Sequence, residues 1–502
     1  MHITELKQSL EKEFNLVLFE DLANFCHQQR AIFDLFKKYR KDSFGMSEKL
    51  VLYSSFELEQ EYINHIQRAA ARCDVANFFI LIVTPYDIRH KLLQANQQHG
   101  YDDVQINSKL LPLADTKIFT NASFIKDINS FCVVPFMGLE LSNNTARACC
   151  KIDLGIPISV QTSALELFKS DSIQYLRDKF ANGEKPKECS ACWKAEQRGS
   201  TSLRLQMLNK HMDEVDQNFF DDVKLRSVSA SPSTVCNFKC RICNSEVSSA
   251  IAQEELKYET DSLALKKLKS LTITPDTLSS ITPAYLVESL RDAEYLHIMG
   301  GEPLLWKYLP TVLDDVVKLG YAKNIQLEFN TNGSIFPTKL LDTFAKFKSV
   351  EILLSIDDIG ERFEFQRGHN WKKIFKNLVS FRDIQSKSIT IKIAPTVNIQ
   401  NVLYLDELYT FCKENNFDMV WWYLDKPKHL CIDRVTQYVK DVVWEKYQTH
   451  PEPELRSIAK RMNETDAMPG AEFLTYMQKL DDRRQQNFKD THPEIFHAMS
   501  QS

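Results

Sequence analysis

Three cysteines within one short stretch constrain this 502-residue chain more than any other feature. They are Cys236, Cys240 and Cys243, in the run Cys-Asn-Phe-Lys-Cys-Arg-Ile-Cys. Thiols at this spacing can bind one face of an iron–sulfur cube, and no fourth cysteine follows in the same stretch. One iron of the cube then lacks a protein ligand and can bind a small chelating molecule. The alternatives are a zinc knuckle and a chance grouping.

The residues on either side of these cysteines predict a strand, a loop and a helix, in that order. The alternating run over residues 225–231 indicates a strand, and residues 244–257 indicate a helix. In a β/α unit, the loop that follows a strand lies at the mouth of the fold, where such proteins build their sites. The three cysteines therefore lie where a catalytic site is expected.

Six strand-like runs separated by helical segments predict an α/β fold over residues 222–430. The runs cover residues 225–231, 295–299, 325–330, 350–356, 390–397 and 419–424. Alternating strands and helices imply a parallel sheet with right-handed crossovers. Six such units predict a partial (β/α)6 TIM-like barrel, which is open at its side to a large substrate.

The cysteine spacing and a second motif together resemble the radical S-adenosylmethionine (SAM) enzymes. The second motif is Gly300-Gly301-Glu302-Pro303, which follows the second predicted strand. By itself such a tetrapeptide is more often an ordinary turn. The resemblance implies that the three cysteines are the catalytic ligands of a [4Fe–4S] cluster whose fourth ligand is SAM. It also implies that residues 300–303 hold the SAM ammonium group through exposed backbone and the Glu302 carboxylate.

Polar residues at the ends of the later strands are further candidates for the SAM site. They are Asn330, Asn332, Ser355, Asp357, Arg367, Thr396 and Asn398. The resemblance implies that Ser355 and Asp357, at the end of the fourth strand, contact the SAM ribose. It also implies that Arg367 lies near the SAM carboxylate or the substrate. Thr396 and Asn398, at the end of the fifth strand, would contact the adenine or the ribose. Strand-terminal turns and a solvated surface arginine are the alternatives.

Four further cysteines are spaced like the ligands of a second metal site. They are Cys132, Cys149, Cys189 and Cys192. The set suits zinc or a second iron–sulfur cluster, and spacing alone does not choose between them. The order of hairpin, helix, turn and Cys-x-x-Cys-Trp resembles the twitch domain, a shortened SPASM domain with one auxiliary [4Fe–4S] cluster. Cys150 competes with Cys149, which is preferred because Asn144 then occupies the turn position of the related pattern.

The chain is expected to have four parts. They are an N-terminal α/β module at 1–122, the twitch-like domain at 123–215, the barrel at 222–430 and a helical extension at 431–502. The first forty residues predict two helices, and residues 50–53 and 77–84 predict strands. A recognition or oligomerisation role and a plain packing extension are both open for the first module. The extension is expected to cover the barrel or the twitch-like domain.

Composition and charge limit the partners and the compartment. The net charge of −5 does not favour nucleic acid or an anionic membrane as partner. No apolar run has the length of a membrane span, and twelve cysteines without a secretory signal indicate a cytoplasmic protein with reduced thiols. His297, His369 and His429 stand alone and are expected to be structural or exposed.

The resemblance also implies the reaction. A reduced cluster, supplied by a donor such as flavodoxin or ferredoxin, cleaves SAM to methionine and a 5′-deoxyadenosyl radical that abstracts hydrogen from a substrate. We expect a peptide or protein side chain as substrate and electron transfer as the role of the auxiliary cluster. A small-molecule dehydrogenase, an RNA-modifying enzyme and a non-catalytic iron–sulfur or zinc scaffold are the alternatives.

Overall fold

The computed structural model describes the strands at 15–19, 50–54 and 78–82 by their backbone, and it describes residues 130–142, 144–152, 154–159, 161–197, 202–211, 219–220, 223–273 and 280–501. The chain divides into a first unit, Met1–Val134 with Arg177–Val223, and a second unit, Pro135–Leu176 with Lys224–Ser502. This division differs from the four expected parts, because residues 138–157 of the expected twitch-like segment pair with the sheet of the second unit.

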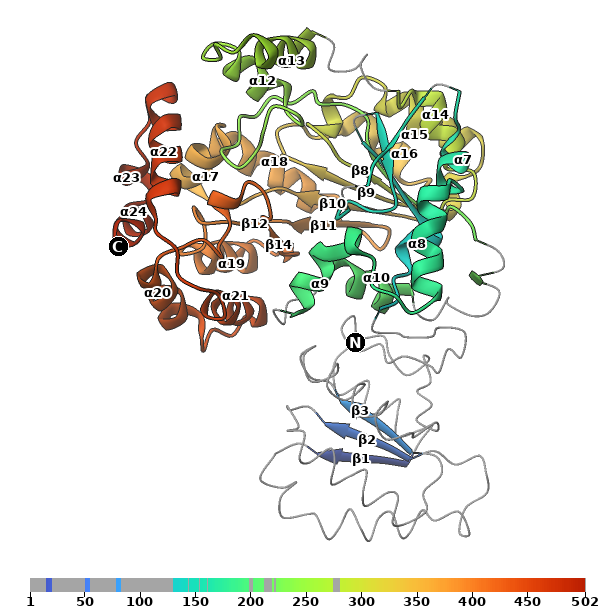
Figure 1. The fold of residues 1–502 in the computed structure, drawn as a ribbon, viewed down its shortest axis with the longest axis horizontal. Coiled ribbons are helices and arrows are strands. Elements are labelled where there is room, and N and C mark those ends of the chain that lie inside the picture. The colour runs from blue at the N-terminus through green and yellow to red at the C-terminus, as the bar shows by residue number, and fades with distance from the viewer. Residues whose placement is uncertain are drawn as a thin grey trace. The chain divides into compact units, whose positions relative to one another are not determined.

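A nine-stranded sheet in the order β13-β11-β10-β9-β8-β7-β4-β5-β6 forms the centre of the second unit (Figure 1). Its strands are β4 Gly138–Ser142, β5 Thr145–Arg147, β6 Ile156–Pro157, β7 Ser227–Ser231, β8 Tyr295–Ile298, β9 Gln326–Thr331, β10 Ser349–Leu354, β11 Ile389–Ile393 and β13 Asp418–Met419. Every pair from β13 to β4 is parallel, whereas β5 and β6 are antiparallel to their neighbours. A parallel pair, β12 Thr396–Val397 and β14 Trp422–Tyr423, stands apart. The six predicted strands are present in the predicted order, which fits a partial TIM-like barrel.

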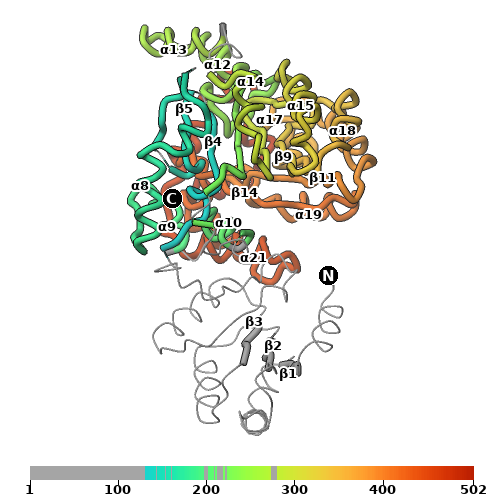
Figure 2. Tube along the Cα trace, turned by 90° about the vertical axis from the view of Figure 1, so that its right-hand side faces the viewer, coloured from blue at the N-terminus to red at the C-terminus, as the bar shows by residue number. Residues whose placement is uncertain are grey.

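Helices alternate with these strands and follow one another around one side of the unit (Figure 2). They are α12 Ser249–Glu255, α13 Ser262–Ile273, α14 Pro283–Ser289, α15 Leu309–Lys318, α16 Leu341–Phe344, α17 Gly360–Arg367, α18 Trp371–Asp383 and α19 Leu405–Glu414. The sequence of α15 explains its packing, because Leu309, Val312, Leu313 and Val316 recur at helical spacing and are all buried. The opposite side of this helix carries its charged residues.

Short elements connect these helices and strands. They are the 3-10 helices η2 Lys187–Cys189, η4 Pro303–Leu305, η5 Ala322–Asn324, η6 Thr338–Leu340 and η7 Lys428–Leu430. Before the barrel come α6 Val134–Met137, α7 Ala164–Phe168, α8 Asp171–Ala181, α9 Ser190–Gln197 and α10 Leu203–His211. Ser163 caps α7 in a capping box with Glu166, so the chain specifies this helix start locally.

Strand alternation gives the sheet one apolar and one polar face. In β8 and β9, Leu296, Ile298, Leu327 and Phe329 are buried, while the residues between them are partly exposed. Successive side chains of a strand point to opposite faces, so the intervening polar residues share the second face.

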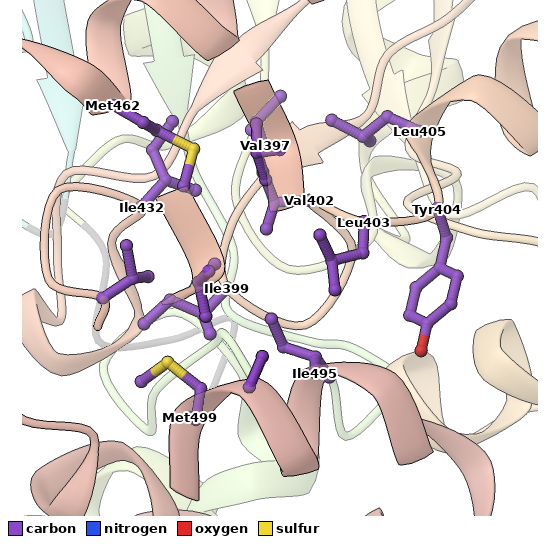
Figure 3. Close-up of a cluster of buried hydrophobic side chains, with 14 of the residues drawn as sticks. Val397, Ile399, Val402, Leu403, Tyr404, Leu405, Ile432, Met462, Ile495 and Met499 are labelled. Carbon is purple, nitrogen blue, oxygen red and sulfur yellow. The ribbon is translucent and has the colours of Figure 1, made fainter. Parts of the chain in front are cut away.

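Five helices complete the chain: α20 Gln437–Tyr447, α21 Pro453–Asn463, α22 Ala471–Arg484, α23 Phe488–Thr491 and α24 Pro493–Ser500. They lie within residues 431–502, which the sequence predicts to be a helical extension. Ile495 and Met499 of α24 lie beside Ile399 and Leu403, in one buried cluster (Figure 3). Burying such side chains contributes roughly 1.5–3 kcal/mol each, so these helices are an integral part of the second unit.

In the first unit, a parallel sheet in the order β1-β2-β3 comprises Asn15–Phe19, Leu50–Ser54 and Phe78–Ile82. The two predicted strands are therefore present. The helical prediction for residues 1–40 is wrong at Asn15–Phe19, where Leu16 and Leu18 fit period 2 as well as a helix. The rest of those two helices lies outside the described residues. No described helix combines the length and the apolar character that crossing a membrane requires.

Candidate active site

Residues 232–248, between β7 and α12, form the loop that carries the three cysteines, and we call it the cluster loop. Its first part pairs with residues 300–303 after β8, the glycine turn. The Gly301 amide donates to Ser233 O at 3.0 Å, and the Glu302 amide donates to Val235 O at 2.7 Å. These bonds extend the pairing of β7 with β8 beyond the strands. The glycine turn thus lies beside residues 233–235, the part of the cluster loop that immediately precedes Cys236.

Two glycines permit this close approach. A Cβ at Gly301 would lie 2.2 Å from Val235 O, and one at Gly300 would lie 2.5 Å from Ser233 O. Gly300 also has a φ of +121°, which residues with a side chain rarely adopt. The obstructing atoms belong to the backbone, so no side-chain rotation relieves the overlap. Glycine is therefore required at both positions for the turn to contact the cluster loop.

The three cysteines lie close enough together for their thiols to affect one another's pKa values. Burial raises the pKa of Cys236, that of Cys240 to about 11 and that of Cys243 to about 12. The neighbouring sulfurs raise the pKa values of Cys240 and Cys243 further, because thiolates repel one another. A bound cation reverses this preference, since a coordinating thiol is deprotonated outright.

The donor set fits an iron–sulfur cluster. Three sulfurs on one loop offer the soft ligands that such clusters use, and the two glycines keep the neighbouring turn free of side chains. Within the described ranges, no three His, Cys, Asp or Glu side chains are gathered closely enough to be assigned to a single metal ion. The fit of these residues to a cluster therefore rests on the thiol chemistry and on the space that Gly300 and Gly301 leave beside the cluster loop.

Glu302 joins the second and third strand ends. Its carboxylate accepts from Thr331 Oγ1 at 2.8 Å, from the Asn332 amide at 2.7 Å and from the Leu304 amide at 3.1 Å. Burial raises the pKa of Glu302 to about 7, and the three donors oppose that shift. A carboxylate has about four acceptor positions, so one remains for a further donor.

The two predicted asparagines near the end of β9, Asn330 within the strand and Asn332 after it, lie in different surroundings. Asn332 Nδ2 donates to Asn237 Oδ1 at 2.9 Å, which ties the third strand end to the cluster loop. Asn330 Oδ1 instead lies 2.6 Å from His297 Nε2 on the polar face of the sheet. Only Asn332 is thereby joined directly to the cluster loop.

Arg367 connects the fourth strand end to a cluster cysteine. Its Nη1 lies 3.7 Å from Cys240 Sγ, and its Nε lies 2.7 Å from Asp357 Oδ2. Both charged side chains are buried. The arginine was expected near the SAM carboxylate or the substrate, and the structure places its guanidinium beside the cluster loop. Its charge lowers the pKa of Cys240 against the effect of burial.

The remaining predicted residues gather around Asp357. Its Oδ1 accepts from the Thr396 amide at 2.8 Å, and Asn398 Nδ2 donates to Thr396 O at 2.8 Å. Ser355 is held through its backbone amide, which donates to Thr331 O. The ends of β9 and β10 and the short strand β12 thus bring Ser355, Asp357, Thr396 and Asn398 close together.

A row of polar side chains on the sheet was missed by the sequence reasoning. His297, Glu328 and Glu351 stand in register on β8, β9 and β10. His297 Nε2 lies 3.6 Å from Glu328 Oε1, and Lys392 Nζ lies 2.7 Å from Glu351 Oε1. The signal was present as polar residues at every second position of Tyr295-Leu-His-Ile and Gln326-Leu-Glu-Phe-Asn, but His297 was taken singly as structural or exposed.

Three cysteines of the expected second site lie in the first unit. Cys132, Cys189 and Cys192 are buried, and burial raises the pKa of Cys132, with the two other thiols acting in the same direction. Arg204 Nη1 donates to Phe131 O at 2.7 Å, and Arg204 Nη2 pairs with Glu196 Oε2 at 2.6 Å. Cys189 and Cys192 are therefore near enough to Cys132 to affect its pKa.

The fourth expected ligand, Cys149, lies in the second unit. It follows β5, the return strand of the predicted hairpin, which is present as β4 and β5. Asn144 adopts the left-handed conformation expected there, with a φ of 66°. Its carbonyl accepts from the Ile158 amide at 2.7 Å. Cys149 is partly buried, whereas the competing Cys150 is exposed.

The part of the chain that holds this site matches the model of a known family. The model of the radical SAM superfamily matches residues 230–409, which contain the cluster loop, the glycine turn and Arg367. Native anSMEcpe with bound AdoMet is similar at 17% identity and a TM-score of 0.29, over 39% of this chain and 52% of that one. SuiB of Streptococcus suis bound to the precursor peptide SuiA is similar at 17% identity and a TM-score of 0.27, over 48% and 54%.

A third solved structure, TYW1 with a lysine-pyruvate adduct bound, is similar at 18% identity and a TM-score of 0.26, over 44% of this chain and 72% of that one. This chain spans little more than half the length of the first two structures. The family model covers all three cluster cysteines. The match over residues 230–409 therefore indicates a radical SAM domain, and such a domain indicates an enzyme with SAM and a [4Fe–4S] cluster as cofactors.

Proposed function

We propose that this protein cleaves SAM reductively at a [4Fe–4S] cluster held by Cys236, Cys240 and Cys243, and that it then abstracts hydrogen from a substrate. The observation that carries the proposal is the backbone pairing of Gly301 and Glu302 with Ser233 and Val235. This pairing joins the turn that would hold SAM to the loop that would hold the cluster. When bound, the reduced cluster supplies the electron that converts SAM to methionine and a 5′-deoxyadenosyl radical.

The chain's own residues position the reactants. Gly300 and Gly301 offer backbone without side chains, and the remaining acceptor position of Glu302 suits an ammonium group. Arg367 supplies a buried positive charge beside Cys240. Asp357 holds that arginine and, together with Thr396 and Asn398, would approach the ribose or adenine. Holding the reacting groups in the reactive geometry lowers the barrier to reaction, because the entropy of bringing them together is already lost on binding.

The polar row His297, Glu328 and Glu351 is the group of side chains that we assign to the substrate. These residues share one face of the sheet with Asn330 and Lys392, whereas the opposite face is apolar. A polar face would orient a polar substrate by hydrogen bonds. A peptide or protein side chain is our proposed substrate, by analogy with enzymes that carry an auxiliary cluster. A small-molecule dehydrogenase is the second candidate, which the same polar row favours.

We assign Cys132, Cys149, Cys189 and Cys192 to an auxiliary [4Fe–4S] cluster of a twitch-like domain. The thiol coupling of the three first-unit cysteines and the turn at Asn144 support this assignment. Four ligands leave no open iron, so electron transfer is its proposed role. A structural zinc site is the alternative. A cytoplasmic location and an electron donor such as flavodoxin or ferredoxin complete the proposal.

The test is iron and labile sulfide content after anaerobic reconstitution, together with 5′-deoxyadenosine formed from SAM and dithionite. We expect about eight irons in the wild type, and about four with no deoxyadenosine in the Cys236, Cys240, Cys243 triple Ala variant. Cys412→Ala is the matched control, because Cys412 is a buried cysteine of α19 that belongs to neither predicted ligand set. Zinc in place of the remaining iron would make the second site structural. A fully loaded wild type that forms no deoxyadenosine with candidate substrates would contradict the proposal.

A further inference from the structure

The cluster loop is bound by a helix that lies far away in the sequence. Four side chains of α22 contact it. Tyr476 Oη donates to Arg241 O at 2.9 Å, and Arg484 Nη1 donates to Lys239 O at 2.9 Å. Asp481 Oδ1 lies 2.6 Å from Arg241 Nη2, and Met477 Sδ lies 3.7 Å from Arg241 Nη1. Lys239 and Arg241 flank Cys240 on either side. The helix therefore holds the backbone next to one cluster ligand from both directions.

Arg241 is the centre of this contact. Its side chain is fully buried between two cluster cysteines, and its guanidinium lies 3.7 Å from the centre of the Phe365 ring. An arginine guanidinium stays charged in proteins. A buried charge is costly unless it is paired, and Asp481 supplies the opposite charge. Gln486 Oε1 accepts a second bond from Nη2 at 2.9 Å.

Asp481 also fixes the end of its own helix. Its Oδ2 accepts from the Phe488 amide at 2.6 Å, which starts α23. The next turn carries His492, whose Nε2 lies 3.1 Å from Gln366 Nε2 of α17. The backbone of that same Gln366 accepts from the Arg241 amide at 2.8 Å. The loop, α17 and the C-terminal helices therefore form a closed set of contacts around Cys240.

Arg484 also contacts α12, the helix that follows the cluster loop. While Nη1 bonds to Lys239 O, Nη2 lies 2.7 Å from Glu254 Oε2 of α12. Helix α12 follows directly after the cluster loop. One side chain thus joins α22 to the loop and to the helix that ends it.

From these contacts we propose that α22 is a positioning element for the cluster, with Asp481, Arg484 and Arg241 as its positioning residues. The proposal rests on the proposed function only in taking Cys236, Cys240 and Cys243 as cluster ligands. Among the described residues, the hydrogen bonds and ion pairs of these side chains go to groups other than the cysteine sulfurs. They hold the loop in the ligand-binding conformation before the cluster is present, so their loss loosens the cluster rather than removing a ligand.

The experiment compares Asp481→Asn and Arg484→Gln with Asp482→Asn in the full-length protein. Asp482 is the matched control, because it neighbours Asp481 on the same helix but is exposed and bonds only within α22, to Gln478. The first readout is the rate of iron transfer from the anaerobically reconstituted protein to an excess of chelator. We expect the rate to rise about tenfold or more in both test variants, which is the effect typical for residues that support metal ligands. Asp482→Asn should match the wild type.

The second readout uses metal-free protein, so that it does not depend on cluster chemistry. Hydrogen exchange of the peptide containing residues 236–243 should accelerate in Asp481→Asn and Arg484→Gln and stay unchanged in Asp482→Asn. If Asp481→Asn does not fold, Arg484→Gln decides, since it leaves the buried Arg241–Asp481 pair intact. Iron release and exchange equal to those of Asp482→Asn would overturn the proposal. A wild type that cleaves no SAM would contradict the proposed function and leave both readouts interpretable.

Discussion

Replacing Gly301 with alanine tests whether the glycine turn and the cluster loop act as one unit. The added Cβ would lie 2.2 Å from Val235 O and 2.7 Å from the carbonyl carbons of Thr234 and Val235. Forcing a methyl group into packed backbone costs about 1–3 kcal/mol. Losing the bond from the Glu302 amide to Val235 O costs about 0.5–1.5 kcal/mol more. We therefore expect the free energy of unfolding to fall by about 2–4 kcal/mol.

The effect on catalysis should exceed the effect on folding. Separating the two loops by an ångström displaces SAM from the cluster, and a misplacement of that size costs about a hundredfold in rate. The assay is urea unfolding together with deoxyadenosine formation under anaerobic conditions. Gly155→Ala is the control, because its Cβ would meet Thr145 at an ordinary 3.5 Å. If Gly301→Ala behaved like Gly155→Ala in both assays, the reasoning would be refuted.

Three further substitutions test other parts of the structure. Glu302→Gln places an amide NH2 against the Asn332 amide, so urea unfolding should show a loss of about 1–3 kcal/mol; an unchanged midpoint would contradict the bonding described for Glu302. Burial, helped by nearby arginines, lowers the pKa of His492 to about 3, below its usual 6.5. The folded protein then binds fewer protons than the unfolded chain, and stability should drop by about 1 kcal/mol between about pH 7.5 and about pH 5.5. His492→Gln should remove that part of the pH dependence, and an equal drop in both proteins would count against it. Ile458→Ala, in the buried cluster that also contains Ile495 and Met499, should lose about 2–5 kcal/mol in the same assay. The exposed Leu319→Ala should lose less than about 0.5 kcal/mol, and similar losses for the two would contradict the packing.

The barrel could be predicted from the sequence because its signals are local. Each strand can be recognised from alternating apolar and polar residues. The residues that follow each strand lie at the same edge of a parallel sheet. That is why Asp357, Thr396 and Asn332 were found together. Asn144 was likewise predictable, since few other residues adopt a left-handed turn.

The remaining features depend on contacts between distant residues. Strand β4 was assigned to a separate domain, yet it pairs in parallel with β7, and no local pattern reveals such a partner. Arg241 and Asp481 are 240 positions apart, so neither residue indicates the other. The polar row was missed because His297 and Glu328 are ordinary single residues until the register of β8 and β9 aligns them.

The most direct test of the central claim is magnetic resonance of the reduced protein with labelled SAM. In a variant lacking Cys189 and Cys192, the cluster at Cys236, Cys240 and Cys243 should show hyperfine coupling to the amino nitrogen and carboxylate oxygen of SAM. That result would establish that the iron without a protein ligand binds SAM. A fully loaded cluster whose spectrum is unchanged by labelled SAM would contradict the account.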